Sequence, residues 1–164
     1  MTTDWTVLLI GGTAAVGKTN AAKRIATVSG ATLLQADDIR LALGLAVPGE
    51  DELTLDGFRR IAVAVSTALE NVIAHHLAST DKIVIEGLWI TPDVASRSSY
   101  GDAVSAARRR AVFVVEDAHE RTTPLTPFES AHARWVLAEA KRHSVPTVSA
   151  RPVGHLAERI LAVL

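Results

Sequence analysis

Short apolar segments alternate along the chain with longer stretches in which apolar residues recur at helical spacing. A short apolar run that ends at glycine or a polar residue is typical of a strand buried on both faces of a parallel sheet. The run that ends at Gly11 is expected to form the central strand. The segments predicted as strands are 5–10, 32–35, 81–87, 111–115 and 145–148.

Helical periodicity predicts helices over 18–28, 38–43, 55–79, 92–110, 128–143 and 153–164. The longest of them carries an apolar stripe that includes Phe58, Val65 and Leu69, and this stripe predicts packing against the core. Strands that alternate with helices in this way indicate the α/β class, with a parallel sheet covered by helices on both faces. Ligands of such sheets bind beyond the carboxyl ends of the strands.

Composition places the chain among globular proteins. Its 164 residues fit one domain spanning 1–164, and apolar residues make up 48% of them. The net charge of -1 argues against nucleic acid as a partner, and no apolar run comes near the roughly 20 residues that span a membrane. The absence of cysteine excludes thiolate metal sites and allows a reducing compartment. The N-terminus lacks the basic region of a signal peptide, so a cytoplasmic location is expected.

A glycine-rich segment between the first strand and the first helix matches a phosphate-binding loop. Gly12 and Gly17 permit the dihedral angles through which backbone N–H groups converge on a phosphate, and the helix adds the positive end of its dipole. Lys18 is expected to contact the β- and γ-phosphates of ATP, or of GTP as the alternative, and Thr19 to coordinate Mg²⁺. The predicted nucleotide-binding residues are Gly12, Thr13, Ala14, Ala15, Val16, Gly17, Lys18, Thr19 and Asn20.

Two carboxylates stand at the ends of predicted strands. Phosphoryl transfer to a hydroxyl group needs a carboxylate that accepts the proton of the acceptor. Asp37 follows strand 32–35 and is the predicted base; Asp38 is the alternative base, and capping of the next helix is the alternative role of Asp37. Glu86 ends the third strand and is predicted to hold Mg²⁺ or contact the acceptor, with a structural role as the alternative. We expect both strands to flank strand 5–10, which directs both carboxylates toward the γ-phosphate.

Other classes of P-loop protein find little support in the sequence. No Asn-Lys-x-Asp motif for guanine specificity and no Asp-x-x-Gly switch motif follows the loop, so a signalling GTPase is not expected. Glu86 is followed by Gly87 and not by a second acid, and the chain lacks room for the extra elements of ring-forming ATPases. A small-molecule kinase is the class that remains.

Three segments together resemble small P-loop kinases of the superfamily that contains shikimate, gluconate and nucleoside monophosphate kinases. They are 10–19, 37–40 and 85–92, with the sequences IGGTAAVGKT, DDIR and IEGLWITP. The pattern is most similar to 2-phosphoglycerate kinase-like and chloramphenicol phosphotransferase-like proteins, although 2-phosphoglycerate kinases tend to have His where Trp89 stands. The resemblance implies the three-layer P-loop NTPase fold, with a five-stranded parallel sheet of order 2-3-1-4-5 and a short lid. It also implies Asp37 as the base that faces the acceptor.

Roles for three arginines also follow from the resemblance. Arg121 lies in the stretch equivalent to the lid, where kinases of this group neutralise transition-state charge. Arg134 on the following helix is the alternative lid arginine, and Arg121 is then an ordinary solvated charge of the loop. Arg151 lies in a loop that contacts the nucleotide base in the similar kinases. From the residues alone, Arg40 and Arg97 are candidates to bind an anionic or polar group of the acceptor, or are ordinary surface residues.

The remaining candidates concern the acceptor and the surface. Gly87 lies at the end of the predicted third strand and Trp89 just past it, and the Trp89 ring is expected near a ligand, where it would pack against a bulky acceptor. The basic run 108–110 is predicted to be the solvated end of a helix. Histidines lack the spacing of metal ligands, so metal binding by histidine is not expected.

The sequence thus predicts an ATP- and Mg²⁺-dependent phosphotransferase that acts on a hydroxyl group of a small molecule. Trp89 and the sparse lid favour an antibiotic or related natural product as the acceptor, and a metabolic sugar acid is the alternative. A protein that binds nucleotide and ligand without transfer, and an ATP hydrolase that switches a protein partner, are competing interpretations. Neither oligomeric state nor the identity of the acceptor can be predicted from the sequence.

Overall fold

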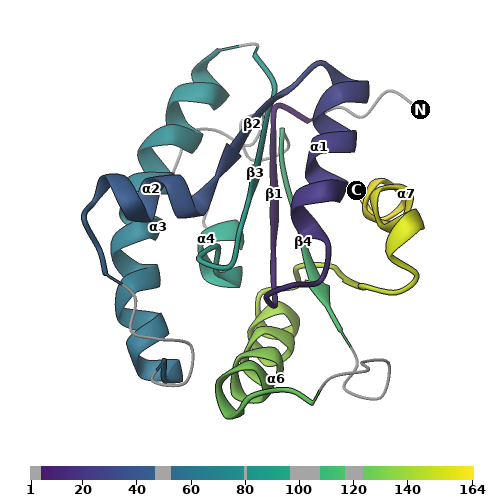
Figure 1. The fold of residues 1–164 in the computed structure, drawn as a ribbon. Coiled ribbons are helices and arrows are strands. Elements are labelled where there is room, and N and C mark those ends of the chain that lie inside the picture. Colours follow the sequence, from purple (N-terminus) through teal and green to yellow (C-terminus); the bar gives the residue numbers. More distant parts are fainter. Residues whose placement is uncertain (1–4, 47–52, 80, 97–107, 117–123) are drawn as a thin grey trace.

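A computed structural model describes residues 5–46, 53–79, 81–96, 108–116 and 124–164. Over these residues a parallel sheet is sandwiched between two layers of helices (Figure 1). Its order is β2-β3-β1-β4-β5, which confirms the predicted α/β fold and its order. The strands are β1 (Val7–Gly12), β2 (Thr32–Gln35), β3 (Ile83–Glu86), β4 (Arg109–Val115) and β5 (Thr147–Ser149).

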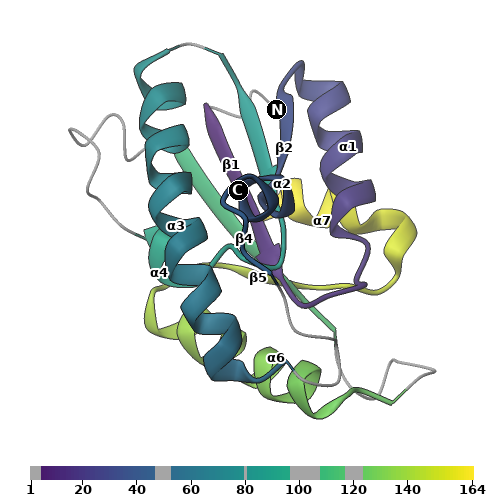
Figure 2. The same ribbon diagram turned by 60° about the vertical axis from the view of Figure 1, so that its left-hand side comes forward.

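The helices of the two layers lie on opposite sides of the sheet (Figure 2). One layer holds α1 and α7, and the other holds α3, α4 and α6. The helical bounds are α1 (Lys18–Ser29), α2 (Ala36–Ala42), α3 (Leu55–Ala78), α4 (Pro92–Ser96), α6 (Pro127–Arg142), the 3₁₀ turn η2 (Val153–His155) and α7 (Leu156–Ala162).

Strand β1 shows why its sequence is apolar without alternation. Val7 and Leu9 pack into the core on the α3 side, whereas Leu8 and Ile10 pack into the core on the α1 side. All four side chains are fully buried, because successive residues of a strand point to opposite faces and both faces are covered. β1 therefore occupies the centre of the sheet, as predicted, and its carboxyl end is held in a rigid frame.

Helix α3 is the long core helix that the apolar stripe predicts. It is long and apolar enough to cross a membrane, but Phe58, Val65 and Leu69 on its stripe are fully buried against the sheet. The Thr54 side chain caps its first turn by accepting a hydrogen bond from the backbone N–H of Gly57 at 3.1 Å. Its apolar character is therefore explained by the protein interior.

Two expectations about local structure are wrong. β2 does not flank β1, because β3 lies between them. Arg109 and Arg110 do not end a helix but begin β4, where they pair with Val7 and Leu8 of β1. Backbone pairing with the central strand outweighs the charge pattern from which a helix end was predicted. The predicted helix 92–110 extends only over α4 before residues that lie outside the described part of the chain.

Gly12 is required by close backbone packing at the end of β1. Its φ is +120°, and a Cβ atom there would lie 2.0 Å from the carbonyl oxygen of Val114 in β4. We therefore expect Gly12→Ala to lower the free energy of unfolding by about 3 kcal/mol, measured by urea denaturation.

Gly30→Ala is the matched control. Gly30 also has a positive φ, of +67°, but a Cβ atom there meets nothing within 4 Å. Its substitution is expected to cost about 1 kcal/mol, from backbone strain alone. Equal losses in the two variants would contradict the steric argument for Gly12.

Candidate phosphoryl-transfer site

The loop between β1 and α1 presents an uncapped helix end. Gly17 is the N-cap of α1, with a φ of 86°; no side chain caps this helix end and no acidic residue lies in its first turn. Ala15 is also in the left-handed region, with a φ of 57°. Backbone N–H groups at such a helix end, together with the helix dipole, favour an anion. Residues 15–20 line a cavity of about 270 Å³ at this position.

Gly12 and Thr13, the first residues of the predicted loop, lie against β4 and do not line this cavity. Gly12 is paired with Val114 in the sheet, and the backbone N–H of Thr13 donates to the Val114 carbonyl at 3.1 Å. The Thr13 side chain is buried, and its Oγ1 has no hydrogen-bond partner among the residues that the structure describes. A buried hydroxyl without a partner fits a site that receives a polar ligand.

Lys18 is buried at the start of α1, with only 6% of its surface exposed. Its Nζ donates a hydrogen bond to the Thr13 carbonyl. Burial lowers the pKa of Lys18 from 10.5 to about 8, while the negative charges of Glu86 and Asp37 act in the opposite direction. The predicted phosphate ligand and the two predicted carboxylates therefore share one electrostatic environment.

Glu86 lies at the end of β3, beside Ile10 of the central strand. It is 4% exposed, and its Oε1 accepts a hydrogen bond from the Thr19 hydroxyl at 2.9 Å. The next residue, Gly87, donates its backbone N–H to the Ile10 carbonyl at 3.1 Å, which continues the pairing of the two strands. Strand order thus brings the two predicted Mg²⁺ ligands together.

Asp37 lies in the first turn of α2, whose N-cap is Gln35, so Asp37 is not the capping residue. Its Oδ1 accepts a hydrogen bond from the Trp89 indole Nε1 at 2.8 Å and lies 3.3 Å from Nε of Arg40. About half of its side chain is exposed. These contacts hold one carboxylate oxygen and orient the group at the edge of the site.

Trp89 is 2% exposed, and its ring stacks on Phe58 of α3 with centroids 5.3 Å apart. The Arg40 guanidinium lies over the same ring at 5.9 Å and donates to the Leu45 carbonyl at 2.7 Å. The ring is therefore packed within the protein, and only its N–H reaches the candidate site. The sequence placed Trp89 beside the site but did not indicate that Phe58 covers the ring.

Arg151 follows β5 and pairs with a carboxylate that the sequence analysis missed. Its Nε donates to Oε1 of Glu116 at 2.8 Å; the Glu116 side chain is buried, whereas that of Arg151 is 45% exposed. Glu116 follows β4 directly. A carboxylate at the end of the fourth strand is the signal that could have identified it, as for Glu86.

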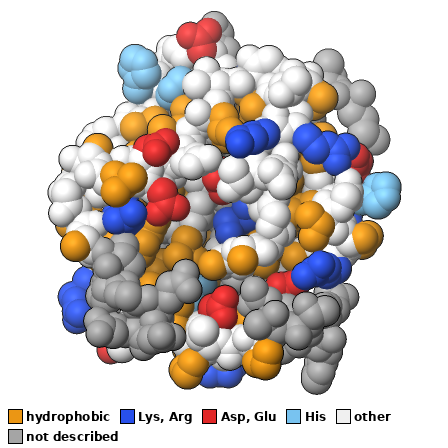
Figure 3. Space-filling model, viewed as in Figure 1, with side chains coloured by type: hydrophobic (Ala, Val, Ile, Leu, Met, Phe, Trp, Pro, Cys, Tyr) orange, Lys and Arg blue, Asp and Glu red, His pale blue; other side chains and the backbone are white. Residues whose placement is uncertain are grey.

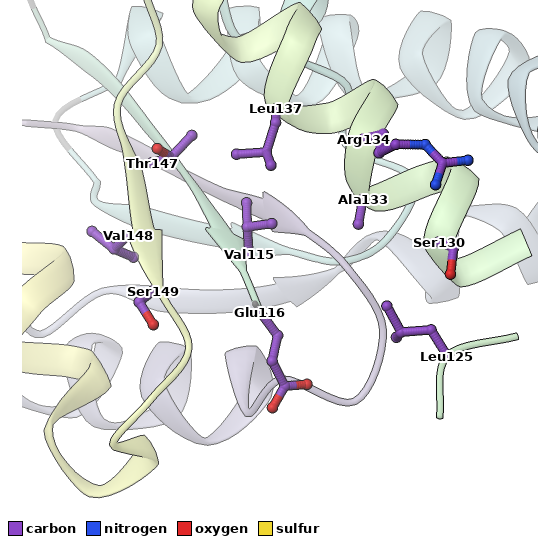
Figure 4. A pocket seen from close by; sticks show the side chains of 10 residues that line it. All are labelled: Val115, Glu116, Leu125, Ser130, Ala133, Arg134, Leu137, Thr147, Val148 and Ser149. Carbon is purple, nitrogen blue, oxygen red and sulfur yellow. The ribbon is translucent and has the colours of Figure 1, made fainter. Parts of the chain in front are cut away.

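The predicted lid arginine and one acceptor candidate cannot be placed. Arg121 and Arg97 lie outside the described residues. Arg134, the alternative lid arginine, is exposed on α6 and lines a cavity of about 510 Å³ together with Glu116 and apolar side chains (Figure 4).

On the face drawn in Figure 3, basic, acidic and hydrophobic side chains of the described residues are intermixed. Among the described residues no group of three or more His, Asp or Glu side chains could hold a metal ion by itself.

Comparison with known proteins gives structural matches only. No protein-family model matches the sequence, and no curated protein matches it. A shikimate kinase from Acinetobacter baumannii, in complex with shikimate, matches with a TM-score of 0.56 and 17% identity, over 97% of this chain and 92% of that one.

Two further solved structures match over nearly the whole chain. A shikimate kinase from Aquifex aeolicus has a TM-score of 0.54 and 14% identity, over 96% of this chain and 94% of the other. A putative kinase from Chloroflexus aurantiacus has a TM-score of 0.54 and 13% identity, over 99% and 96%. The chain has a P-loop kinase fold.

Proposed function

We propose that the protein is an ATP- and Mg²⁺-dependent phosphotransferase that transfers the γ-phosphoryl group to a hydroxyl group of a small molecule. The observation that carries the proposal is that Thr19, the neighbour of Lys18, donates a hydrogen bond to Glu86, while the negative charges of both Glu86 and Asp37 act on the buried Lys18. Nucleotide binding requires Lys18 but does not require a carboxylate such as Asp37. The half-exposed carboxylate of Asp37, held at the edge of the site, is the additional group that transfer to a hydroxyl requires.

In the proposed reaction the P-loop amides and Lys18 hold the phosphates, and Asp37 receives a proton. The acceptor oxygen forms a bond to the γ-phosphorus while the bond between that phosphorus and the bridging oxygen of ADP breaks. The acceptor proton passes to Asp37, whose position is maintained by the bond from Trp89. Lys18 offsets the negative charge on the phosphoryl oxygens in a buried environment, where electrostatic stabilisation is strong.

The donor atoms around the loop fit Mg²⁺ and a nucleotide. The Thr19 hydroxyl and the Glu86 carboxylate are oxygen ligands 2.9 Å apart, the type that Mg²⁺ prefers. Bound there, the ion would neutralise charge on the phosphates. The unpartnered Thr13 hydroxyl fits a phosphate oxygen. Arg151 keeps its proposed role beside the nucleotide base, with Glu116 orienting its guanidinium.

For the acceptor we favour a small polyhydroxy acid over a bulky antibiotic. The antibiotic prediction depended on a sparse lid, whose residues 117–123 lie outside the described part of the chain, and on a free Trp89 ring, which is instead buried against Phe58. Arg40 lies beside Asp37, and its positive charge would attract the carboxylate of an acidic acceptor. Arg97 and Arg121 keep their proposed roles in binding the acceptor and neutralising phosphate. The shikimate bound to the Acinetobacter baumannii kinase is an acid of this type.

A phosphotransfer screen tests the proposal. The protein is incubated with Mg²⁺ and either ATP or GTP, and with gluconate, shikimate, a nucleoside or chloramphenicol as acceptor. A phosphorylated acid is the expected product. Transfer to chloramphenicol alone would favour the antibiotic interpretation. Rapid phosphate release without acceptor would favour a hydrolase, and binding without any product would favour a sequestering protein.

Trp89→Phe tests the proposed positioning of Asp37. Phenylalanine can still stack on Phe58 but cannot donate a hydrogen bond to the Asp37 carboxylate. We expect kcat to fall by about 10-fold, because small displacements of a reacting group are costly, while the Kd for Mg²⁺–ATP stays unchanged. Phe128→Leu, in the aromatic cluster around Phe58 but without a bond to Asp37, is the control. Unchanged kcat in Trp89→Phe would refute the positioning role.

A further inference from the structure

One buried histidine lies outside the chemistry described so far. His132 projects from α6 and is 1% exposed, and its Nε2 has no hydrogen-bond partner among the residues that the structure describes. Aromatic rings surround the imidazole: Phe58 meets it edge-on at 4.5 Å, Phe128 stacks on it at 5.4 Å and Trp135 at 6.0 Å. A buried polar atom without a partner is rare in native proteins and fits a site that receives a ligand.

His132 is close enough to Lys18 for the lysine charge to act on it. α6 lies beyond the end of β1 from which the phosphate-binding loop departs (Figures 1 and 2). Burial, together with the positive charge of Lys18, lowers the pKa of His132 from 6.5 to about 4. The imidazole is therefore neutral at pH 7, with one ring nitrogen as a donor and the other as an acceptor.

The aromatic contacts indicate on which side of Lys18 the imidazole lies. His132 packs on Phe58, Phe58 stacks on Trp89, and Trp89 donates to Asp37. This row of residues lies on the α3 side of the sheet, opposite to α1 and α7. His132 is therefore on the side of the proposed acceptor, where the terminal phosphate of a bound triphosphate would lie next to Lys18.

We propose that His132 binds the γ-phosphate, with the Nε2–H group donating a hydrogen bond to a phosphate oxygen from the acceptor side. A neutral donor can stand beside Lys18 without charge repulsion and adds a contact that a diphosphate cannot make. The proposal rests on the nucleotide-binding part of the proposed function. It does not depend on phosphoryl transfer or on the identity of the acceptor.

Affinities for a triphosphate and a diphosphate test this assignment without an acceptor. We would measure Kd for Mg²⁺–AMP-PNP and for Mg²⁺–ADP by calorimetry in the wild type and in three variants. His132→Phe removes both ring nitrogens, His132→Asn keeps a polar group only near the Nδ1 position, and His132→Gln keeps a donor near Nε2. Trp135→Phe, in the same aromatic cluster, is the control for packing.

We expect His132→Phe and His132→Asn to weaken AMP-PNP binding about 10-fold or more, as for loss of a hydrogen bond to a charged group, and ADP binding by less than about 2-fold. His132→Gln and Trp135→Phe should stay near the wild type for both nucleotides. Equal weakening for AMP-PNP and ADP, or no weakening, would overturn the assignment. If the wild type bound neither AMP-PNP nor ADP, the proposed function itself would be refuted.

A measurement on the wild type keeps the test valid if a variant fails to fold. In protein labelled with ¹⁵N at histidine, the His132 Nε2 resonance reports hydrogen bonding of that nitrogen. The resonance is expected to shift on addition of Mg²⁺–AMP-PNP and to stay in place with Mg²⁺–ADP. A resonance that responds in the same way to both nucleotides would mean that His132 does not contact the γ-phosphate.

Discussion

Asp37→Asn is expected to reduce the rate of phosphoryl transfer by about 10²- to 10⁴-fold, the usual contribution of a general base. Asparagine retains an oxygen that can accept the hydrogen bond from Trp89, so the local structure should persist. It cannot accept the acceptor proton. The measurement is kcat with Mg²⁺–ATP and the acceptor that reacts fastest in the screen, together with the Kd for Mg²⁺–ATP, which should stay within about 2-fold of the wild type.

Asp38→Asn provides the matched control for this prediction. Asp38 is the next residue of α2 and is exposed, and both named contacts, from Trp89 and Arg40, are made with Asp37. Activity in Asp38→Asn should remain near that of the wild type. If the two variants exchanged their behaviour, Asp38 would be the base; if both remained fully active, general-base catalysis by either residue would be refuted.

Lys18→Met is expected to have opposite effects on activity and on stability. Loss of the ammonium group should lower kcat by about 10²- to 10³-fold, because a buried positive charge stabilises the transition state. The unliganded protein should become more stable, because methionine fills similar space without the cost of burying a charge. Urea denaturation measures this gain, which we expect to be about 2 kcal/mol at pH 7.

The stability gain expected for Lys18→Met should depend on pH in a definite direction. The pKa of Lys18 is about 8 in the folded protein and 10.5 without the fold, so the unfolded chain binds more protons between these values. The destabilisation by Lys18 is fully present below pH 8 and disappears as the pH rises toward 10.5. Between pH 7 and pH 9 the wild type should gain about 1 kcal/mol relative to Lys18→Met.

Lys23→Met serves as the control on the same helix. Lys23 is exposed on α1, so its replacement should change neither kcat nor the pH dependence of stability. A Lys18→Met variant that retained the pH dependence of the wild type would show that another group causes it. Such a result would remove the argument that Lys18 is a buried cation held ready for phosphate.

The sequence by itself determined the local parts of this protein. The loop 12–19 was identified because its residue types follow from backbone geometry and charge within one short segment. The bounds of α3 were predicted almost to the residue, since a long apolar stripe at helical spacing is a strong local pattern. Glu86 was predicted as a site residue because it ends an apolar run, and parallel strands present their carboxyl ends to the ligand.

Only the tertiary structure decided which side chains meet across long stretches of chain. The Trp89 indole reaches Asp37 over 52 positions, and its ring is covered by Phe58. His132 lies on α6, where the charge of Lys18 acts on it. No local pattern near either residue indicates this interaction. Arg109 and Arg110 were mistaken for a helix end because pairing with β1 is a non-local interaction.

The sequence predicts local structure but not these long-range contacts, because local structure depends on neighbours in the sequence, whereas the contacts depend on neighbours in space. Periodicity, turn residues and helix dipoles act within a few positions and can be predicted from a short segment. Burial and the pKa of a group depend on everything packed around it, so the lowered pKa values of Lys18 and His132 exist only in the folded chain. The loop could therefore be located from the sequence, whereas the positions of its partners depend on the packing of α3 and α6 against the sheet.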